Sequence, residues 1–366
     1  MLDTAVASKE KIVQLDSSAP LVTARLPQWV PAGSLIGIVI LLVGISALID
    51  IAGNRPVSWL GPLLVAVLIW IVVIYILARV VEGKRRAFDR LMSTLVWSAF
   101  VVAVAPLVSL LWTVIVGGIA RMDALFFTNS MRGVVGQGGG ALHAIIGTVE
   151  VTLFAALISV PIGLLTAIYI VEYGSGKKIT RAITFFVDVM TGIPSIVAGL
   201  FAYSLFLMIL GPGSQNGFAG SVALSILMIP VVVRSSEEML RLVPADLREA
   251  SYALGVPRWR TITKVVLPTA LPGITTGIML AISRVVGETA PLLIVSGFTH
   301  SMNYNLFDGP MMTLPVFVYN SFMSQGADAQ AYVDRAWAGA LTLILIVVAL
   351  NLVARFISRL ARRNVK

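Results

Sequence analysis

The sequence predicts an all-α protein of the membrane, a polytopic transmembrane helical bundle with about eight spanning helices. Of its 366 residues, 58% are hydrophobic and only 12% are charged. One soluble core could not bury that much apolar surface, so lipid must be the solvent for most of the chain. The apolar segments also recur with short gaps, and no gap is long enough for a separate soluble domain. One membrane domain with short tails is expected.

Eight windows are long and apolar enough to cross a bilayer as helices, which takes roughly 20 residues each. They lie at about 33–51, 60–80, 93–117, 142–170, 183–210, 218–234, 270–297 and 336–357. The sixth window is the shortest and the weakest. Residues 1–32 precede the first window, are polar and rich in proline, and lack the features of a cleaved signal peptide. A disordered cytoplasmic tail is expected there.

The basic residues show a strong bias between the two sides of this eight-span map. With a cytoplasmic N-terminus, 22 of the 27 Lys and Arg residues fall on the cytoplasmic side. Positively charged loops stay in the cytoplasm, so both termini are predicted to be cytoplasmic. The net charge of +9 then reports the position of the loops and gives no indication of nucleic-acid binding. The absence of cysteine excludes disulfides and thiolate chemistry.

The loop at 118–141 faces outward on this map and contains five glycines between Gly133 and Gly140. A glycine-rich loop before a helix can offer backbone N–H groups to an anion. No strand precedes it and no Lys-Ser/Thr follows it, so a flexible lid or spacer is the favoured interpretation. The P-loop pattern GxxxxGK[ST] occurs nowhere in the sequence, so any ATP that drives this protein must be bound by another chain.

The cytoplasmic loop 234–268 is longer than most membrane connections. Within it, 244–254 begins with Pro244 and Asp246 and stops before Gly255, which predicts a helix of three turns. Leu247, Tyr252 and Leu254 could fill a groove on a partner. From spacing alone, a docking helix and a solvated surface helix are equally favoured.

The residues of this loop resemble the EAA loop of ABC-importer permeases, which inserts a short coupling helix into the ATPase subunit. The matching residues are Glu249, Ala250, Gly255, Leu267 and Pro268. Ser251 and Val265 depart from the pattern by small changes in size. The resemblance implies that this loop couples the chain to a separate ATPase.

The wider resemblance covers roughly residues 90–360 and is to the phosphate-importer permease family, in particular its PstA type. It is carried by Gly138-Gly-Gly140, Ile146-Gly-Thr148, Ile168-Tyr-Ile-Val-Glu-Tyr-Gly174, Pro194-Ser-Ile-Val197 and Arg284-x-x-Gly287-Glu-Thr-Ala-Pro-Leu-Leu293. It implies a six-helix permease core of the type I ABC importers at 91–360, with the coupling loop 234–268. Two additional N-terminal helices at 33–90 and the tails 1–32 and 361–366 lie outside that core.

The resemblance also implies a location and a set of partners. The chain would be a multi-pass protein of the bacterial plasma membrane that imports inorganic phosphate and forms half of the pathway. Its partners would be a second, PstC-like permease, two PstB-like ATP-binding subunits and an extracytoplasmic PstS-like phosphate-binding protein. No cofactor is expected in this chain, because the PstB-like subunits would bind ATP.

Arg284 and Glu288 are the two ionisable residues predicted near the centre of a span, the seventh. An arginine there costs about 3 kcal/mol on insertion scales, so it should face a bundle interior or water. The i, i+4 spacing would place both on one helical face, about 6 Å apart along the axis. They could neutralise each other and aid packing. A guanidinium, however, also suits a tetrahedral oxyanion, and the family resemblance implies that both residues act in phosphate movement.

Three other functions remain open. A permease for another oxyanion, such as sulfate or molybdate, is the nearest, because a separate binding protein would set much of the selectivity. A secondary transporter would show internal repeats or several acids at mid-membrane. A membrane enzyme would need a nucleophile, base or metal cluster. With His143 and His300 far apart in sequence, neither a catalytic nor a metal site is expected.

Overall fold

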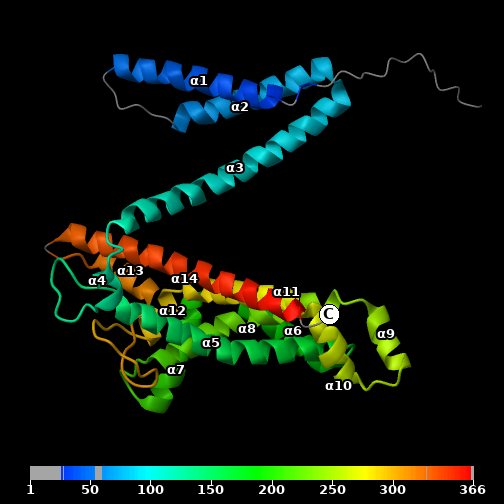
Figure 1. The fold of residues 1–366 in the computed structure, drawn as a ribbon, viewed down its shortest axis with the longest axis vertical. Coiled ribbons are helices and arrows are strands. Elements are labelled where there is room, and N and C mark those ends of the chain that lie inside the picture. Colours follow the sequence, from blue (N-terminus) through cyan, green and yellow to red (C-terminus); the bar gives the residue numbers. More distant parts are fainter. Residues whose placement is uncertain (1–25, 28, 54–59, 327, 364–366) are drawn as a thin grey trace, which may run out of the picture. The chain divides into compact units, whose positions relative to one another are not determined.

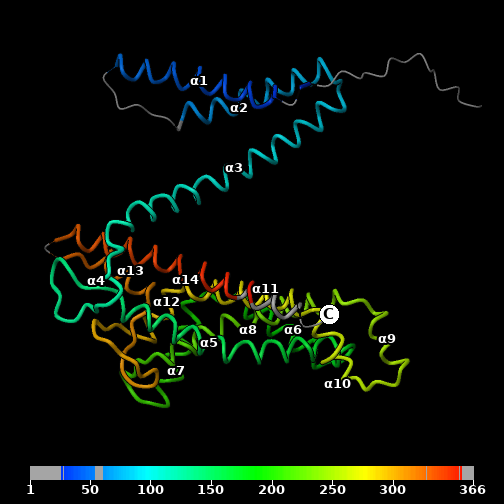
Figure 2. Tube along the Cα trace, viewed as in Figure 1, coloured from blue at the N-terminus to red at the C-terminus, as the bar shows by residue number. Residues whose placement is uncertain are grey.

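The computed structural model describes residues 26–27, 29–53, 60–326 and 328–363, and every regular element among them is helical. The all-α prediction is therefore confirmed. Most of the predicted tail 1–32, and residues 364–366, lie outside the described residues. The chain divides into two compact units, residues 1–110 and 111–366. Figure 1 labels the helices and Figure 2 follows the same path as a tube.

The first unit contains the two additional N-terminal helices that the sequence predicts. They are α1 (Trp29–Ala52) and α2 (Leu60–Val81), and they lie side by side. The indole of Trp70 on α2 donates hydrogen bonds to the carbonyl of Pro31 (2.9 Å) and the hydroxyl of Ser34 (3.1 Å) on α1. Both helices expose large aliphatic side chains, as lipid-facing spans do.

A buried ion pair closes the turn from α2 into α3 (Lys84–Ile119), which begins in the first unit. Arg90 donates to both carboxylate oxygens of Glu82, at 2.6 and 2.7 Å, and the backbone N–H of Leu26 adds a bond of 2.7 Å. Burial alone would raise the pKa of Glu82, but the hydrogen bonds from Arg90 and Leu26 and the charges of Arg90 and Arg86 lower it. Glu82 therefore stays ionised and fixes this turn.

The second unit begins within α3 and holds the remaining helices, which are packed as one bundle around α8. In chain order they are α4 (Ala124–Thr128), α5 (Leu142–Ile168), the π-helix η1 (Tyr169–Tyr173), α6 (Lys178–Thr191), α7 (Ser195–Leu210), α8 (Gly217–Arg241), α9 (Ala245–Ala253), α10 (Arg258–Thr261), the π-helix η2 (Ile262–Val266), α11 (Leu267–Val286), α12 (Ala290–Val295), α13 (Leu314–Met323) and α14 (Ala329–Arg363).

The window that looked weakest in the sequence forms α8, the most buried span of the second unit. Two thirds of its apolar window is buried, whereas the corresponding fraction of each other candidate span is below one third. Its small polar residues bond the neighbouring helix: Ser221 donates to the carbonyl of Val151 (3.0 Å) and Ser225 to that of Ala155 (3.4 Å). The low hydropathy of α8 follows from protein neighbours on most sides, where small residues favour close packing.

The predicted fifth span, 183–210, is present as two helices and not as one straight helix. Between α6 and α7 the chain bends by 108° at Gly192-Ile-Pro194, because a proline restricts the residue before it and cannot donate a backbone hydrogen bond. Ser221 meets Val151 and Ser225 meets Ala155, so α5 and α8 run parallel. Two parallel spans require the chain to return between them, which favours counting α6 and α7 as one bent span. On that count the described residues contain eight candidate spans.

Two further boundaries differ from the sequence predictions. Helix continues without a gap from Arg258 through Pro268 to Val286, so much of the predicted loop 234–268 is helical and the seventh span ends before 297. The π-helical turn η2 precedes Pro268 and changes the hydrogen-bond register where the proline lacks an N–H. The last span starts at Ala329 instead of 336, and the first turns of α14 contact the glycine-rich loop through Arg335.

Candidate functional site

The predicted charge pair does not form, and the helix that should carry it ends between its two members. Arg284 lies in the last turn of α11, Gly287 caps that helix, and Glu288 follows the cap with its N–H donating to the carbonyl of Val285 (3.1 Å). Arg284 is exposed and Glu288 is half-buried. Within the described ranges, neither side chain makes an ion pair or a hydrogen bond. The i, i+4 geometry and the position at the centre of the span were therefore wrong.

The helix break that separates Arg284 from Glu288 is held firmly by its surroundings. After the break, α12 packs so closely on α7 that a Cβ at Gly199 would lie 2.7 Å from the Cα of Pro291. Leu292 is buried, and a Cβ at Gly220 of α8 would lie 2.6 Å from the hydroxyl of Ser296. Irregular backbone inside a membrane occurs where it is covered by protein or faces a water-filled cavity. The break thus presents the unpaired guanidinium of Arg284 at the surface of the second unit.

The helix predicted at 244–254 and expected to couple to an ATPase is present as α9, and its end is built as expected. Gly255 adopts a left-handed conformation (φ 74°) that disfavours other residues. Its N–H bonds the carbonyl of Tyr252 (2.9 Å), and the N–H of Val256 bonds that of Ser251 (3.2 Å). These two bonds form a Schellman motif, which satisfies the last carbonyls of the helix. The short helix therefore has a defined stop.

The outer face of α9 is exposed and partly apolar. Glu249, Ala250 and Gly255 are exposed, and so are four large hydrophobic side chains around them. These four are Leu242, Leu247, Tyr252 and Leu254, of which Leu254 is 83% exposed. Leu267 and Pro268, the other predicted coupling residues, are half-buried at the start of α11 and connect this face to the membrane helices. An exposed helix with an apolar face suits insertion into a groove on a partner.

One ion pair, which the sequence analysis missed, holds α9 against the bundle. Arg248 on α9 donates from Nε (3.1 Å) and Nη2 (2.9 Å) to one carboxylate oxygen of Glu172 in η1. Its guanidinium also donates to the carbonyl of Leu240 (2.9 Å), in the last turn of α8, and to that of Val243 (2.6 Å), in the turn between α8 and α9. The side chain of Glu172 is 3% exposed and that of Arg248 is 17% exposed. One guanidinium thus joins the ends of α5 and α8 to the coupling helix.

A second contact ties α9 to the helix that follows it. The hydroxyls of Ser251 and Thr261 lie 2.8 Å apart in a buried hydrogen bond. Ser251 is one of the two residues that depart from the EAA pattern, and an alanine at this position could not make this bond. The substitution therefore adds a connection between α9 and the long helix that leads to Arg284.

At the opposite end of the second unit, the glycine-rich loop contacts the bundle through its carbonyls and not through its N–H groups. Arg335 of α14 is 1% exposed and donates from Nη1 to the carbonyls of Gly136 (2.6 Å) and Gly138 (3.0 Å). Arg121 donates to the carbonyl of Gly139 (2.8 Å). The loop is thus packed on α14, which differs from the free spacer that its composition favoured. The nearby His300 has a lowered pKa, first through partial desolvation and then through the charge of Arg335.

Comparison with known proteins places these features in a family. Residues 159–366 match the family model described as "Binding-protein-dependent transport system inner membrane component". The chain belongs to this family of transport permeases. As a member, it is a multi-pass membrane subunit of a binding-protein-dependent ABC importer, a class that works with a partner permease, an ATPase and a binding protein.

Two relatives show how far the similarity extends along the permease. The chain is 49% identical over 284 residues to the phosphate transport system permease protein PstA 1 of Mycobacterium tuberculosis, covering 77% of this chain and 91% of the relative. It is 39% identical to PstA of Pasteurella multocida, covering 74% of this chain and 94% of the relative. A solved chain of the inward-facing MetNI methionine ABC transporter is 21% identical, with a TM-score of 0.47 over 61% of this chain and 94% of that one.

Proposed function

We propose that this permease is one transmembrane subunit of an ATP-driven importer of inorganic phosphate and forms half of its translocation pathway. The observation that carries the proposal is the 49% identity to a phosphate permease over 77% of the chain. The exposed coupling helix and the unpaired guanidinium at a helix break fit a subunit that docks an ATPase and conducts an anion. Sulfate or molybdate permeases would share the same physical features.

In this proposal the chain hydrolyses no ATP and holds no cofactor. The sequence has no P-loop pattern, so two PstB-like subunits would bind ATP and transmit its hydrolysis through α9. Glu249 and Ala250 would face the ATPase, and Gly255 would end the helix that the ATPase receives. The pair of Glu172 and Arg248 would pass the movement of α9 to α5 and α8, because all three are joined at one guanidinium.

The partner on the membrane side would be a PstC-like permease, and a PstS-like protein would deliver phosphate to the outer face. Arg284 would contact the anion as it passes the break between α11 and α12. Because Glu288 lies beyond the break and leaves Arg284 unpaired, the guanidinium fork is free for a tetrahedral oxyanion. The half-buried carboxylate of Glu288 nearby would limit how tightly the anion is held, as a conduit requires.

The proposed orientation in the bacterial plasma membrane rests on the eight candidate spans and on the distribution of charge. An even number of crossings would put both termini on one side, and the excess of Lys and Arg favours the cytoplasm as that side. On this orientation α9, Glu172 and the ends of α5 and α8 are cytoplasmic, where an ATPase could reach them.

Reconstitution of the complex in proteoliposomes tests the proposed function. With the binding protein outside and ATP inside, uptake of radiolabelled phosphate should require both ATP and this chain. A tenfold excess of unlabelled phosphate should compete, and the same excess of sulfate or molybdate should not. Competition by sulfate alone would reassign the substrate, and uptake driven by an ion gradient without the ATPase would reject the importer class.

A further inference from the structure

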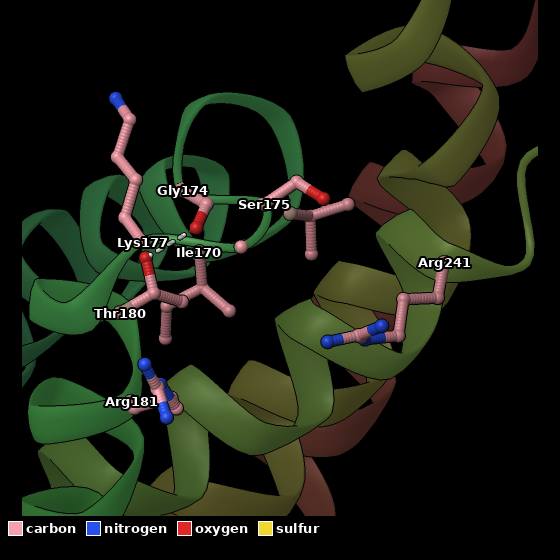
Figure 3. Close-up of a pocket in the computed structure, with 9 residues that line it drawn as sticks. Ile170, Gly174, Ser175, Lys177, Thr180, Arg181 and Arg241 are labelled. Carbon is pink, nitrogen blue, oxygen red and sulfur yellow. Dashed lines mark hydrogen bonds between the residues drawn. The ribbon is translucent and has the colours of Figure 1, made fainter.

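A basic cavity of about 220 Å³ lies beside the coupling helix and has no role in the transport pathway described above. It lies between the loop from η1 to α6 and the end of α8 (Figure 3). Nine described residues line it: Ile170, Val171, Gly174, Ser175, Gly176, Lys177, Thr180, Arg181 and Arg241. Three of these are basic and none is acidic. The cavity is smaller than the roughly 300–1,000 Å³ sites that hold drug-sized ligands, which points to a small ligand or a single head group.

The loop that forms one wall of the cavity has a fixed shape. The hydroxyl of Thr180 donates to the carbonyl of Gly174 (2.6 Å), and a Cβ at Gly174 would lie 2.2 Å from that hydroxyl oxygen. Gly176 has a φ of 76°, which disfavours other residues. Only a glycine therefore allows the loop to fold back on Thr180. The wall is preformed and does not need a ligand to shape it.

The charges around the cavity are not balanced. Arg241 donates from Nε (3.1 Å) and Nη2 (2.8 Å) to one oxygen of Glu237, and its Nη1 has no hydrogen-bond partner among the described residues. Glu237 also pairs with Arg234, which has Asp188 as a second partner, so these two guanidinium groups are matched by two carboxylates. The excess positive charge at the cavity therefore comes from Lys177 and Arg181. Arg181 has no ion pair or side-chain hydrogen bond within the part of the chain that the structure describes. Figure 3 shows Arg241 reaching toward the space beside Thr180 and Arg181, while Lys177 turns its ammonium group away.

We propose that this cavity binds a phosphate-type oxyanion through the guanidinium of Arg181 and Nη1 of Arg241. Guanidinium groups match tetrahedral oxyanions with paired hydrogen bonds. Two sources present this chemistry on the cytoplasmic side: the head group of an anionic phospholipid and free inorganic phosphate. Basic clusters next to spans attract anionic lipid there. The site is inferred from the cavity and its charges, so it stands whichever anion the permease transports.

The position of the cavity gives its occupant access to the coupling machinery. Ile170 and Val171 line it from η1, the same turn that carries Glu172. Arg241 follows Leu240, whose carbonyl accepts a hydrogen bond from Arg248 of the coupling helix. An anion that draws Arg241 and the η1 loop together would therefore act one residue away from Glu172 and from Leu240, two of the three residues that Arg248 contacts. The site is placed to set how firmly α9 is held.

Residue-specific protection from phenylglyoxal tests the site. The full-length chain is placed in phosphatidylcholine nanodiscs, and mass spectrometry follows the modification of Arg181, Arg241 and the exposed Arg260 on α10. Inorganic phosphate is added in one arm, with chloride at equal ionic strength as its control. In a second arm, phosphatidylglycerol replaces part of the phosphatidylcholine and no phosphate is added.

Modification of Arg181 should slow by roughly tenfold when the anion is present at ten times its dissociation constant, while Arg260 is unaffected. Slowing in the phosphate arm alone assigns free phosphate, and slowing in the phosphatidylglycerol arm alone assigns a lipid head group. In Arg181→Gln the protection of Arg241 should be lost, and in Lys178→Gln, which removes a charge next to the cavity without lining it, protection should remain. Equal protection of Arg181 and Arg260, or none in either arm, would overturn the proposal.

Discussion

Replacement of Arg248 by glutamine should release the coupling helix without unfolding the bundle. The change leaves the carboxylate of Glu172, whose side chain is 3% exposed, without its cation, and it removes donors from the carbonyls of Leu240 and Val243. Breaking one side of a buried ion pair costs about 3–5 kcal/mol. Because the side chain of Arg248 is itself 17% exposed, the lower end, about 3 kcal/mol, is expected. That cost raises the population of the released helix by roughly 150-fold.

Hydrogen exchange measured by mass spectrometry reads this release directly. Peptides that cover Ala245–Ala253 should exchange up to roughly 150-fold faster in Arg248→Gln, while peptides from α8 keep their protection. Glu172→Gln keeps the shape of the acceptor and should show a smaller effect, of about 1–2 kcal/mol, since only the charge assistance is lost. Arg260→Gln is the matched control, because Arg260 is exposed and pairs with no carboxylate in the described residues.

The functional consequence is a loss of coupling. In the reconstituted complex, Arg248→Gln should lower the amount of phosphate imported per ATP hydrolysed, because movement of α9 no longer reaches α5 and α8. Wild-type exchange in α9 together with a normal transport ratio would refute the assignment of this pair to coupling. Fast exchange across the whole second unit would show instead that the pair holds the fold.

Two further predictions concern the coupling helix and the topology. Gly255→Pro should abolish nucleotide-dependent uptake and co-purification of the ATPase, because proline cannot adopt the φ of 74° or donate the N–H to Tyr252. Gly255→Ala should have a milder effect, because alanine in the left-handed conformation costs only roughly 1 kcal/mol. Glu249→Lys should block docking of the ATPase while the protein still inserts into the membrane. Normal co-purification of the ATPase with all three variants would reject α9 as the docking element. Reporter fusions at Lys366 and Gly138 should lie on opposite sides of the membrane, and a shared side would mean that α6 and α7 do not form one crossing.

The membrane class, the helical fold and α9 could be predicted because they depend on local sequence. Hydropathy alone locates helices in lipid, and Gly255 marks the end of α9 through a conformation that few other residues adopt. The central, buried position of α8 could not be predicted from hydropathy. Its serines and glycines lower its hydropathy, and only the arrangement of its neighbours shows that protein, and not lipid, surrounds it.

The errors at the candidate site come from tertiary context. Nothing in the spacing of Arg284 and Glu288 indicates that α11 stops at Val286, because Gly287 is compatible with a helix interior. The break is stabilised by the close contact of Pro291 with Gly199, which lies far away in sequence. The pair of Glu172 and Arg248 spans 76 residues, and a single sequence shows both charges on the cytoplasmic side without showing that they meet.

Arg284 is proposed to contact the transported anion at the break between α11 and α12, and phosphate uptake by Arg284 variants is the most direct test of that role. The importer is reconstituted with wild-type, Arg284→Lys, Arg284→Gln or Arg284→Gln/Glu288→Gln permease, with assembly checked by co-purification and ATPase activity measured in the same vesicles. Because Arg284 makes no ion pair within the described ranges, its removal should leave assembly and ATPase activity intact. Both Gln variants should lose most phosphate uptake, and Arg284→Lys should keep a part of it. Full uptake by Arg284→Gln, alone or with Glu288→Gln, would contradict the account.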